Sequence, residues 1–262
     1  MSTLTEVSAY NDDRGNKIIS PTTFTNNIHV TFRGSNNTLI IDPTAKIGWL
    51  KVRFDCDNGV LELGGRSPHR GPLRADVRVG QDSSIRVGKN VTTTKLCMLV
   101  AVEGTSLTLG DDVMIASDVE IRTDDAHPIF DVDSGRRINW SKDVAVGNHV
   151  WIASRAIVRP GTSIGEGSVV GLNSIVKGSF PNNCIIAGTP ARVVRRNVAW
   201  ERPHLSNSKP FYKPDASTVK KSKYWNPTEV EARPVAANVT PWARIKRRAR
   251  HHKKQLIGLI RH

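Results

Sequence analysis

Cysteine is scarce in this sequence. Its only three cysteines, in 262 residues, are Cys56, Cys97 and Cys184. An odd number of cysteines without metal-ligand spacing builds neither a disulfide framework nor a zinc site. We therefore expect free thiols and a reducing compartment, which favours the cytoplasm.

Aromatic residues and long apolar runs are also rare. Phe, Trp and Tyr make up 6% of the chain, which suits a narrow core filled by Val, Ile and Ala. No run of 18 apolar residues is present, so no transmembrane helix is expected. The first 16 residues lack an apolar centre and include Glu6, Asp12 and Asp13, which is unlike a secretory signal.

Acidic residues are few at the C-terminal end. Residues 201–262 hold 15 Lys and Arg against 4 Asp and Glu, so most of the net charge of +14 lies there and a nucleic-acid footprint spread over the chain is not indicated. Six prolines in the same range predict an extended, poorly packed segment over 201–240. The stretch 241–262 is either a solvated basic terminus or an amphipathic helix for anionic lipid or a polyanionic partner. The sequence leaves both open.

What the sequence does contain is a repeat of six residues, each opening on a β-branched aliphatic. Its members are Val146, Ile152, Val158, Ile164, Val170 and Val176. A helix repeats near 3.6 residues and a strand at 2, so a step of six indicates a larger unit. The pattern is typical of a parallel β-helix, in which each unit makes one short strand and a turn and three units complete a coil.

The step continues upstream with less regularity. It includes Leu109, Ile115 and Ile121 and, further back, Val79, Ile85, Val91 and Cys97. It fails at Glu103. Short strands over 26–34, 35–42 and 60–65 are expected as longer, imperfect coils of the same solenoid. The expected organisation is an N-terminal segment (1–25), an all-β, β-helix domain (26–197) and a basic, Pro-rich extension (198–262).

The repeat breaks sharply after Ile121. The next aliphatic position is His127 and the frame resumes at Val146, so an inserted loop is predicted over 127–143. Departures from a strict structural rule concentrate at functional sites. An imidazole held by a carboxylate at one nitrogen can accept a hydroxyl proton at the other, so His127 is the candidate general base. The candidates for the orienting carboxylate are Asp124, Asp125, Asp131 and Asp133.

Segments 117–131, 146–152 and 187–191, together with the hexads, resemble the left-handed β-helix acetyltransferases, and most closely the capsule and polysialic acid O-acetyltransferases. The resemblance covers residues 26–197. It implies a left-handed coil, a homotrimer, and acetyl-CoA lying in a groove between neighbouring subunits.

The resemblance also implies site residues. His127 matches the family's catalytic histidine, and Trp151 matches a tryptophan at the transfer site, although a packing role at a coil corner would suit it equally. The cofactor-contacting turns match Ala153, Gly171 and Lys177. The terminal basic residues that meet the phosphates match Arg192, Arg195 and Arg196, which can equally face water. Small residues would let the pantetheine approach backbone amides, and basic ones would neutralise phosphate.

The predicted activity is acetyl-CoA-dependent O-acetylation of a sugar or polysaccharide by direct transfer, without a metal, in the cytoplasm or at the inner face of the membrane. Two alternatives stay open: N-acetylation of an amino sugar or sugar nucleotide, and a non-catalytic trimeric scaffold recruited through the basic tail. A zinc-dependent carbonic anhydrase of this solenoid type needs converging histidines, and Ser154 stands where His149 would require a histidine partner.

The acceptor is the least defined part of the prediction. Arg136, Arg137, Trp140 and Lys142 of the inserted loop could hold an acidic sugar, and the basic tail would attract a polyanionic chain. Each can equally be loop surface. Relatives usually end soon after the terminal coil, so the extension beyond Asn197 leaves the acceptor and the location open.

Overall fold

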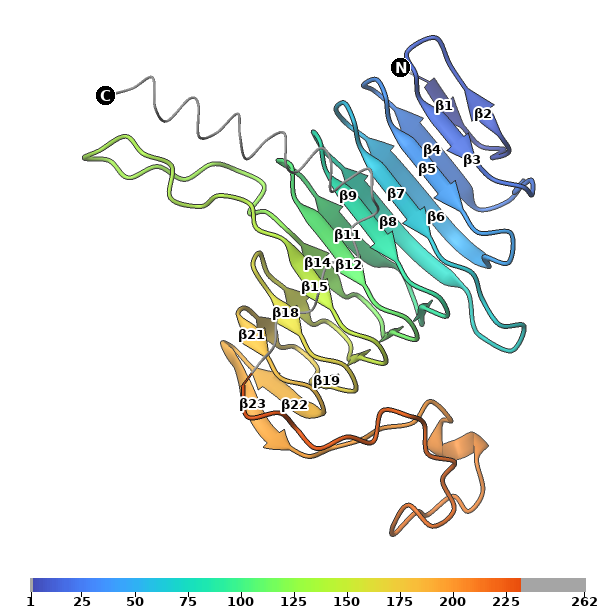
Figure 1. Cartoon of the computed structure of the whole chain (residues 1–262), viewed down its shortest axis with the longest axis vertical. Helices are drawn as coiled ribbons and strands as arrows, with labels where there is room; N and C mark the ends of the chain where they lie inside the picture. Colours follow the sequence, from blue (N-terminus) through green and yellow to red (C-terminus); the bar gives the residue numbers. More distant parts are fainter. Residues whose placement is uncertain (1, 232–262) are drawn as a thin grey trace.

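The computed structural model describes residues 2–231 and shows a parallel β-helix (Figure 1). The chain winds into stacked coils, and each coil adds one strand to each of the sheets that run along the stack. The expected all-β solenoid is confirmed. We number the sheets in the order in which a C-terminal coil visits them.

Sheet 1 consists of β1 (Ser2–Leu4), β4 (Ile28–Phe32), β6 (Ile47–Phe54), β8 (Leu73–Val79), β11 (Cys97–Ala101), β14 (Glu120–Arg122), β17 (Ile157–Val158) and β20 (Ile175–Val176). Sheet 2 consists of β2 (Tyr10–Asn11), β3 (Lys17–Ile19), β5 (Thr38–Ile41), β7 (Val60–Leu63), β9 (Ser84–Val87), β12 (Ser106–Leu109), β15 (Val144–Val146), β18 (Ser163–Ile164) and β21 (Ser179–Phe180). Sheet 3 consists of β10 (Thr92–Thr93), β13 (Met114–Ile115), β16 (Trp151–Ile152), β19 (Val169–Val170), β22 (Cys184–Gly188) and β23 (Ala191–Arg196). One 3-10 helix, η1 (Leu205–Asn207), lies in the extension.

The coils change length along the stack. Ile85 on β9 pairs with Leu107 on β12, 22 residues later, whereas Val146 pairs with Ile164, 18 residues later. Eighteen residues are three hexads, so the strict repeat describes only the coils from residue 144 onward. The earlier coils have longer strands, and sheet 3 begins only at residue 92.

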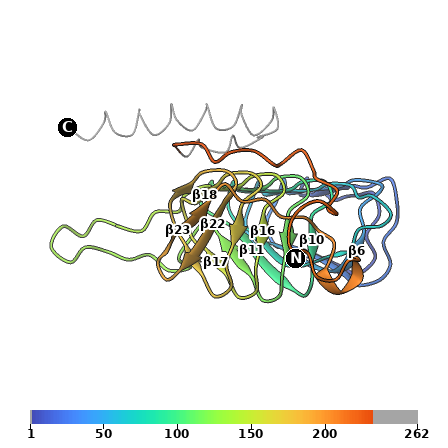
Figure 2. The same cartoon turned by 90° about the horizontal axis from the view of Figure 1, so that it is seen from below.

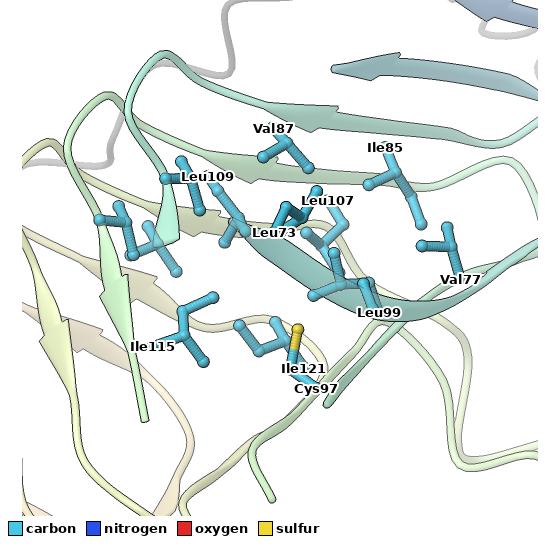
Figure 3. Packing of buried hydrophobic residues seen from close by; sticks show 14 of the residues in the cluster. Leu73, Val77, Ile85, Val87, Cys97, Leu99, Leu107, Leu109, Ile115 and Ile121 are labelled. Atoms are coloured by element: carbon cyan, nitrogen blue, oxygen red, sulfur yellow. The ribbon is translucent and has the colours of Figure 1, made fainter. Parts of the chain in front are cut away.

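Inward-facing aliphatic side chains form one continuous core. All six members of the regular repeat are fully buried, and so are the seven upstream positions assigned to the same step. Figure 3 shows Val87, Leu107, Leu109 and Ile115 meeting inside the coils. Each fully buried Val or Ile contributes roughly 1.5–3 kcal/mol. Glu103 breaks the step because it lies in a turn, with a φ of 55°, where the longer coil passes from sheet 1 to sheet 2.

Glycines line the corner between sheets 2 and 3. A Cβ atom on Gly88 would lie 2.5 Å from the carbonyl oxygen of Gly110, and one on Gly110 would lie 2.6 Å from the carbonyl carbon of Gly147. Real Cβ atoms do not approach backbone this closely, so the coils can stack at this corner only where no side chain intervenes.

Antiparallel strands close both ends of the solenoid. β1 pairs antiparallel with β4, and β2 pairs antiparallel with β3, which is itself parallel to β5. Residues 2–25, expected as a separate segment, therefore belong to the solenoid. At the other end β23 pairs antiparallel with β22.

Residues 197–231 follow β23 and fold back onto the coils (Figure 1). The expectation of a poorly packed segment is wrong at its two ends: Tyr224 is buried, and Arg202 and Trp200 bond to the solenoid. It holds for most of 203–221, which is exposed and lacks strands. The helix predicted over 241–262 lies outside the described residues. Within residues 2–231 no helix is long and apolar enough to cross a membrane.

The three cysteines are free, as expected. Cys97 and Cys184 are buried, and burial raises the pKa of the Cys97 thiol to about 12. A thiol of this kind is a packing group, not a nucleophile.

Candidate active site

The inserted loop leaves the solenoid after β14 and returns at β15. It projects from the body as a long arm (Figures 1 and 2). The coil itself is not interrupted, because Val144 and Val146 pair directly with Leu107 and Leu109. His127 therefore does not replace a core aliphatic, as the hexad frame suggested. It is an exposed residue at the base of the arm.

Backbone and side-chain bonds fix the base of the arm. The Asn139 amide donates from Nδ2 to the His127 carbonyl (2.9 Å), and its Oδ1 accepts from the Ile129 N–H (2.7 Å). Asp125 is held by an ion pair with Arg159, which lies just after β17. The position of the His127 backbone is thus set by residues on both sides of the loop.

The His127 imidazole has no hydrogen-bond partner among residues 2–231. None of the four carboxylates expected to orient it does so within one chain. Asp124 accepts from Arg122 Nε (3.2 Å) and from the Ala126 N–H (2.9 Å). Asp125 is engaged by Arg159, and hydrogen bonds from Ser134 lower the pKa of Asp131. The ring is left available to another molecule.

The loop cations are not equivalent. Arg137 bonds to Glu103 and lies 4.9 Å from the centre of the Trp140 ring. That bond is the main reason the pKa of Glu103 is lowered. Arg136 and Lys142 are exposed. Of the residues predicted to hold an acidic sugar, Arg137 and Trp140 are thus engaged with each other and with the coil.

A row of side chains runs along the outer face of sheet 3. Met114, Trp151 and Val169 are paired in register on β13, β16 and β19 and point outward, since their neighbours Ile115, Ile152 and Val170 are buried. The Trp151 side chain is 37% exposed. This row makes an apolar strip that crosses three coils.

Ala153 and Gly171 stack at the end of this row. A Cβ atom on Gly171 would lie 3.0 Å from the Ala187 Cβ, so small residues keep this corner low. The expectation that their amides are open to a ligand is wrong, because Ala153 N–H donates to the Val170 carbonyl and Gly171 N–H to the Ile186 carbonyl. What these residues offer is space.

The basic residues of β23 lie beside this strip. Arg192 pairs with Ala187 and Arg195 with Ile185. Both arginines are exposed, as is Arg196, whose Nη1 donates to the Glu229 carbonyl (3.2 Å).

One chain does not bring all the predicted site residues together. His127 and Lys177 stand where coils pass from sheet 1 to sheet 2, whereas Trp151, Ala153 and Gly171 lie on or just after the strands of sheet 3. Within residues 2–231 no hydrogen bond or ring contact links His127 to Trp151. The residues form two groups on different sides of the coil stack.

The sequence analysis missed a cluster next to Trp151. His149 is 2% exposed; its Nδ1 lies 2.7 Å from Asp112 Oδ2 and its Nε2 lies 3.0 Å from the Trp200 carbonyl. Its ring stacks on Trp200 and on Tyr224. No sequence spacing reports contacts between residues 37 to 75 positions apart. Within residues 2–231 no three His, Cys, Asp or Glu side chains are grouped to hold a metal.

Comparison with known proteins gives close matches. The chain is 34% identical over 185 residues to the polysialic acid O-acetyltransferase of Neisseria meningitidis, covering 70% of this chain and 84% of that protein. It is 38% identical over 130 residues to the polysialic acid O-acetyltransferase of Escherichia coli O1:K1 / APEC, covering 50% of this chain but only 42% of that protein. The solved structure of the polySia specific acetyltransferase NeuO matches with a TM-score of 0.63 and 32% identity, covering 75% of this chain and 84% of that one. No protein-family model matches.

The fold and these relatives define the class: the chain belongs to the hexapeptide-repeat acetyltransferases. Within that family its relatives include polysialic acid O-acetyltransferases, and the chain is an acetyltransferase. The family expected from the sequence motifs is confirmed.

Proposed function

We propose that this acetyltransferase moves the acetyl group of acetyl-CoA to a hydroxyl of a sugar or polysaccharide, with His127 as general base. The observation that carries the proposal is the contrast between two histidines. His149 is buried and bonded at both ring nitrogens, as a structural histidine should be. His127 is exposed, and its ring is unbonded within residues 2–231. An exposed imidazole can exchange a proton near neutral pH.

The outer face of sheet 3 fits acetyl-CoA, which supplies the thioester that the acceptor attacks. The apolar strip of Met114, Trp151 and Val169 suits the pantetheine arm. The low corner at Gly171, where an added Cβ would meet Ala187, leaves room for it. Exposed arginines on β23, such as Arg195, would neutralise phosphate. Lys177 would reach the same ligand from a neighbouring copy, since it lies at a different corner.

In the proposed reaction His127 accepts the proton of the acceptor hydroxyl as the hydroxyl oxygen bonds to the thioester carbonyl. The carbon–sulfur bond then breaks, and the imidazolium returns the proton to the departing sulfur. The products are an acetyl ester and a free thiol, with no net change in protons and no acetyl group on the enzyme. Trp151 would orient the thioester.

We propose that the site forms between copies of the chain in a homotrimer. His127 and Trp151 lie on different sides of one coil stack, so a second copy is needed to bring them together. The arm supports this, because it exposes large apolar side chains that a neighbour could cover. They are Ile129, Phe130, Val132, Ile138 and Trp140.

We propose an acidic sugar polymer as acceptor. Two relatives are named polysialic acid O-acetyltransferases. The arm that carries His127 also presents exposed Arg136 and Lys142, and no carboxylate pairs with either within residues 2–231. Cations placed this way attract a polyanion.

The test is thiol release from acetyl-CoA with neutral and acidic oligosaccharides, for wild type, His127→Ala and His29→Ala. His29 is an equally exposed histidine on β4 and serves as the control. We expect one acceptor class to stimulate release, His127→Ala to lower it by about 10²–10⁴-fold, and His29→Ala to leave it unchanged. An alkali-stable product would mean amide formation and N-transfer. Absence of release with every acceptor, in a folded oligomer, would contradict the enzyme proposal and favour the scaffold.

A further inference from the structure

The Trp151 ring has an aromatic neighbour from outside the β-helix. Trp200, four residues after the end of β23, lies with its ring centre 6.0 Å from that of Trp151 at an interplanar angle of 46°. Trp151 itself belongs to a strand of only two residues and is partly exposed. Its ring therefore has few other groups to hold it in one rotamer.

Trp200 is itself held by two reciprocal hydrogen bonds with His149. Trp200 Nε1 donates to the His149 carbonyl (3.0 Å), and the Trp200 carbonyl lies 3.0 Å from His149 Nε2. The two rings stack at 4.2 Å, and Tyr224 stacks on the other face of the imidazole at 4.7 Å. Four rings thus follow one another, from Trp151 through Trp200 and His149 to Tyr224.

Arg202 fastens this segment to two earlier coils. Its Nη2 donates to the Asp112 carbonyl (2.7 Å) and to the Asn90 carbonyl (3.2 Å), and its Nη1 donates to Thr92 Oγ1 (2.9 Å). Its Nε lies 2.7 Å from Asp112 Oδ1, an ion pair in which the N–H does not point at the oxygen. Burial and the nearby charge of Arg70 lower the pKa of Arg202, with Asp112 opposing them. Placing a guanidinium there is costly, which argues for a specific anchor.

The far end of the same segment is tied down as well. Asn183 Nδ2 donates to the carbonyls of Val198 (3.0 Å) and Tyr224 (2.5 Å), and Thr228 Oγ1 donates to the Asn183 carbonyl (2.7 Å). The segment is therefore anchored before and after its exposed part, and Trp200 lies inside the first anchor.

We propose that Trp200 is a positioning residue for acetyl transfer: residues 197–231 hold its ring against Trp151 and so keep Trp151 in the orientation that the reaction needs. The inference rests on the proposed function, because it takes Trp151 as part of the transfer site. It assigns to the extension a part in the site that the β-helix alone does not provide. A misplacement of about 1 Å at a reacting centre costs up to about 10²-fold in rate.

A purely structural role is the alternative, in which Trp200 only covers His149 and stabilises the coil. The two roles differ in their coupling to Trp151. If Trp200 acts through Trp151, removing it matters only while Trp151 is present, so the two substitutions are non-additive in rate. A stabilising cover would lower the melting temperature and leave that coupling at zero.

The experiment is a double-mutant cycle on the full chain, with Trp151→Phe, Trp200→Ala and the double variant, read as kcat, as KM for acetyl-CoA and by near-UV circular dichroism. Trp200→Phe tests rescue, because it keeps a ring but not the Nε1 donor. Trp225→Ala is the matched control, a tryptophan of the same segment that bonds Glu201 instead.

The result expected is a fall in kcat of about 10- to 100-fold for Trp200→Ala, no further fall when it is added to Trp151→Phe, partial recovery in Trp200→Phe, and wild-type kcat in Trp225→Ala. The circular dichroism signal of the coupled tryptophans is expected to disappear in both single variants at Trp151 and Trp200.

Two results overturn the inference and are distinguishable. If Trp151→Phe is impaired while Trp200→Ala keeps wild-type kcat, or if the two effects add, only the positioning role fails. If wild type shows no transfer, or Trp151→Phe is fully active, the proposed site fails and the inference with it.

Discussion

Coils before residue 92 and coils after it differ in length, in the number of sheets and in what they carry. The earlier coils have strands of up to eight residues, as in β6, and build sheets 1 and 2 only. The later coils add sheet 3, and from residue 144 they shorten to eighteen residues. All the candidate site residues lie in this later part. A longer coil buries more and a shorter coil presents more corners, so the solenoid separates support from chemistry along its axis.

The cores of the two parts differ in the same sense. Tyr10, Phe32 and Phe54 form an aromatic stack inside the early coils, with ring centres 5.9 and 5.1 Å apart. The regular late coils are filled by single Val and Ile residues. Aromatic stacks add stabilisation beyond the area they bury, so the early part is expected to hold the larger share of stability per residue.

The strongest test of this division concerns the two groups of site residues. If the site is shared between copies, His127→Ala and Trp151→Ala are each nearly inactive alone, but a mixed oligomer contains sites with one intact His127 and one intact Trp151. For random mixing at equal amounts about one quarter of the sites are restored. Co-expression with two affinity tags followed by the thiol-release assay measures this. Mixed oligomers no more active than either parent would place the whole site in one chain.

A second test compares the two cores. Phe54→Ala removes a fully buried ring from the early part and is expected to lower the free energy of unfolding by about 3–5 kcal/mol, whereas Ile164→Val in the late part should cost only about 0.5–1.5 kcal/mol. Chemical denaturation of both variants gives these values. The comparison breaks if Ile164→Val proves the more damaging change.

How much of this division the sequence could predict depends on the coil. The hexads identified the late coils because each inward position recurs at a fixed step. In the early coils the inward residues alternate within long strands, as Leu50, Val52 and Phe54 do on β6, and the step between coils is not a multiple of six. β6 and β8 were therefore not predicted, although alternation along them was a usable signal.

The site was predictable only in part. The position of the inserted arm followed from the break after Ile121. The environment of His127 did not, because the frame placed it in the core while the chain had left the coil. The contacts of Trp200 and Arg202 join residues 51 and 90 or more positions apart, and no local pattern encodes such a return of the chain.

A third test uses the glycine corner that both parts share. Gly110→Ala places a Cβ against the backbone of the next coil and is expected to cost about 1–3 kcal/mol. Gly71→Ala is the control, since nothing lies within 4 Å of the added atom. Melting temperatures of the two variants should differ clearly. Equal melting temperatures would show that the coils can separate at this corner.

The smallest effect is expected from pH. Burial alone would raise the pKa of Asp112, but the hydrogen bond with His149 and the charges of Arg202 and Arg70 lower it overall. A carboxyl whose pKa is lowered by folding adds stability above its unfolded pKa of about 4, and this is lost as the pH falls through the lower folded value. The stability gap between wild type and Asp112→Asn should therefore shrink between about pH 5 and pH 2. A gap that stays constant in thermal melts would contradict the assignment.

The reversed strands at the two ends of the solenoid determine where the molecule stops. A stack of identical coils presents at each end a row of free backbone donors and acceptors, which is the template on which fibres grow. Here β1 and β2 at one end and β23 at the other run against the direction of the coils. An incoming coil from another molecule would meet a strand of the wrong polarity at either end. The protein can therefore associate side by side, where its arms and sheet faces lie, without elongating end to end.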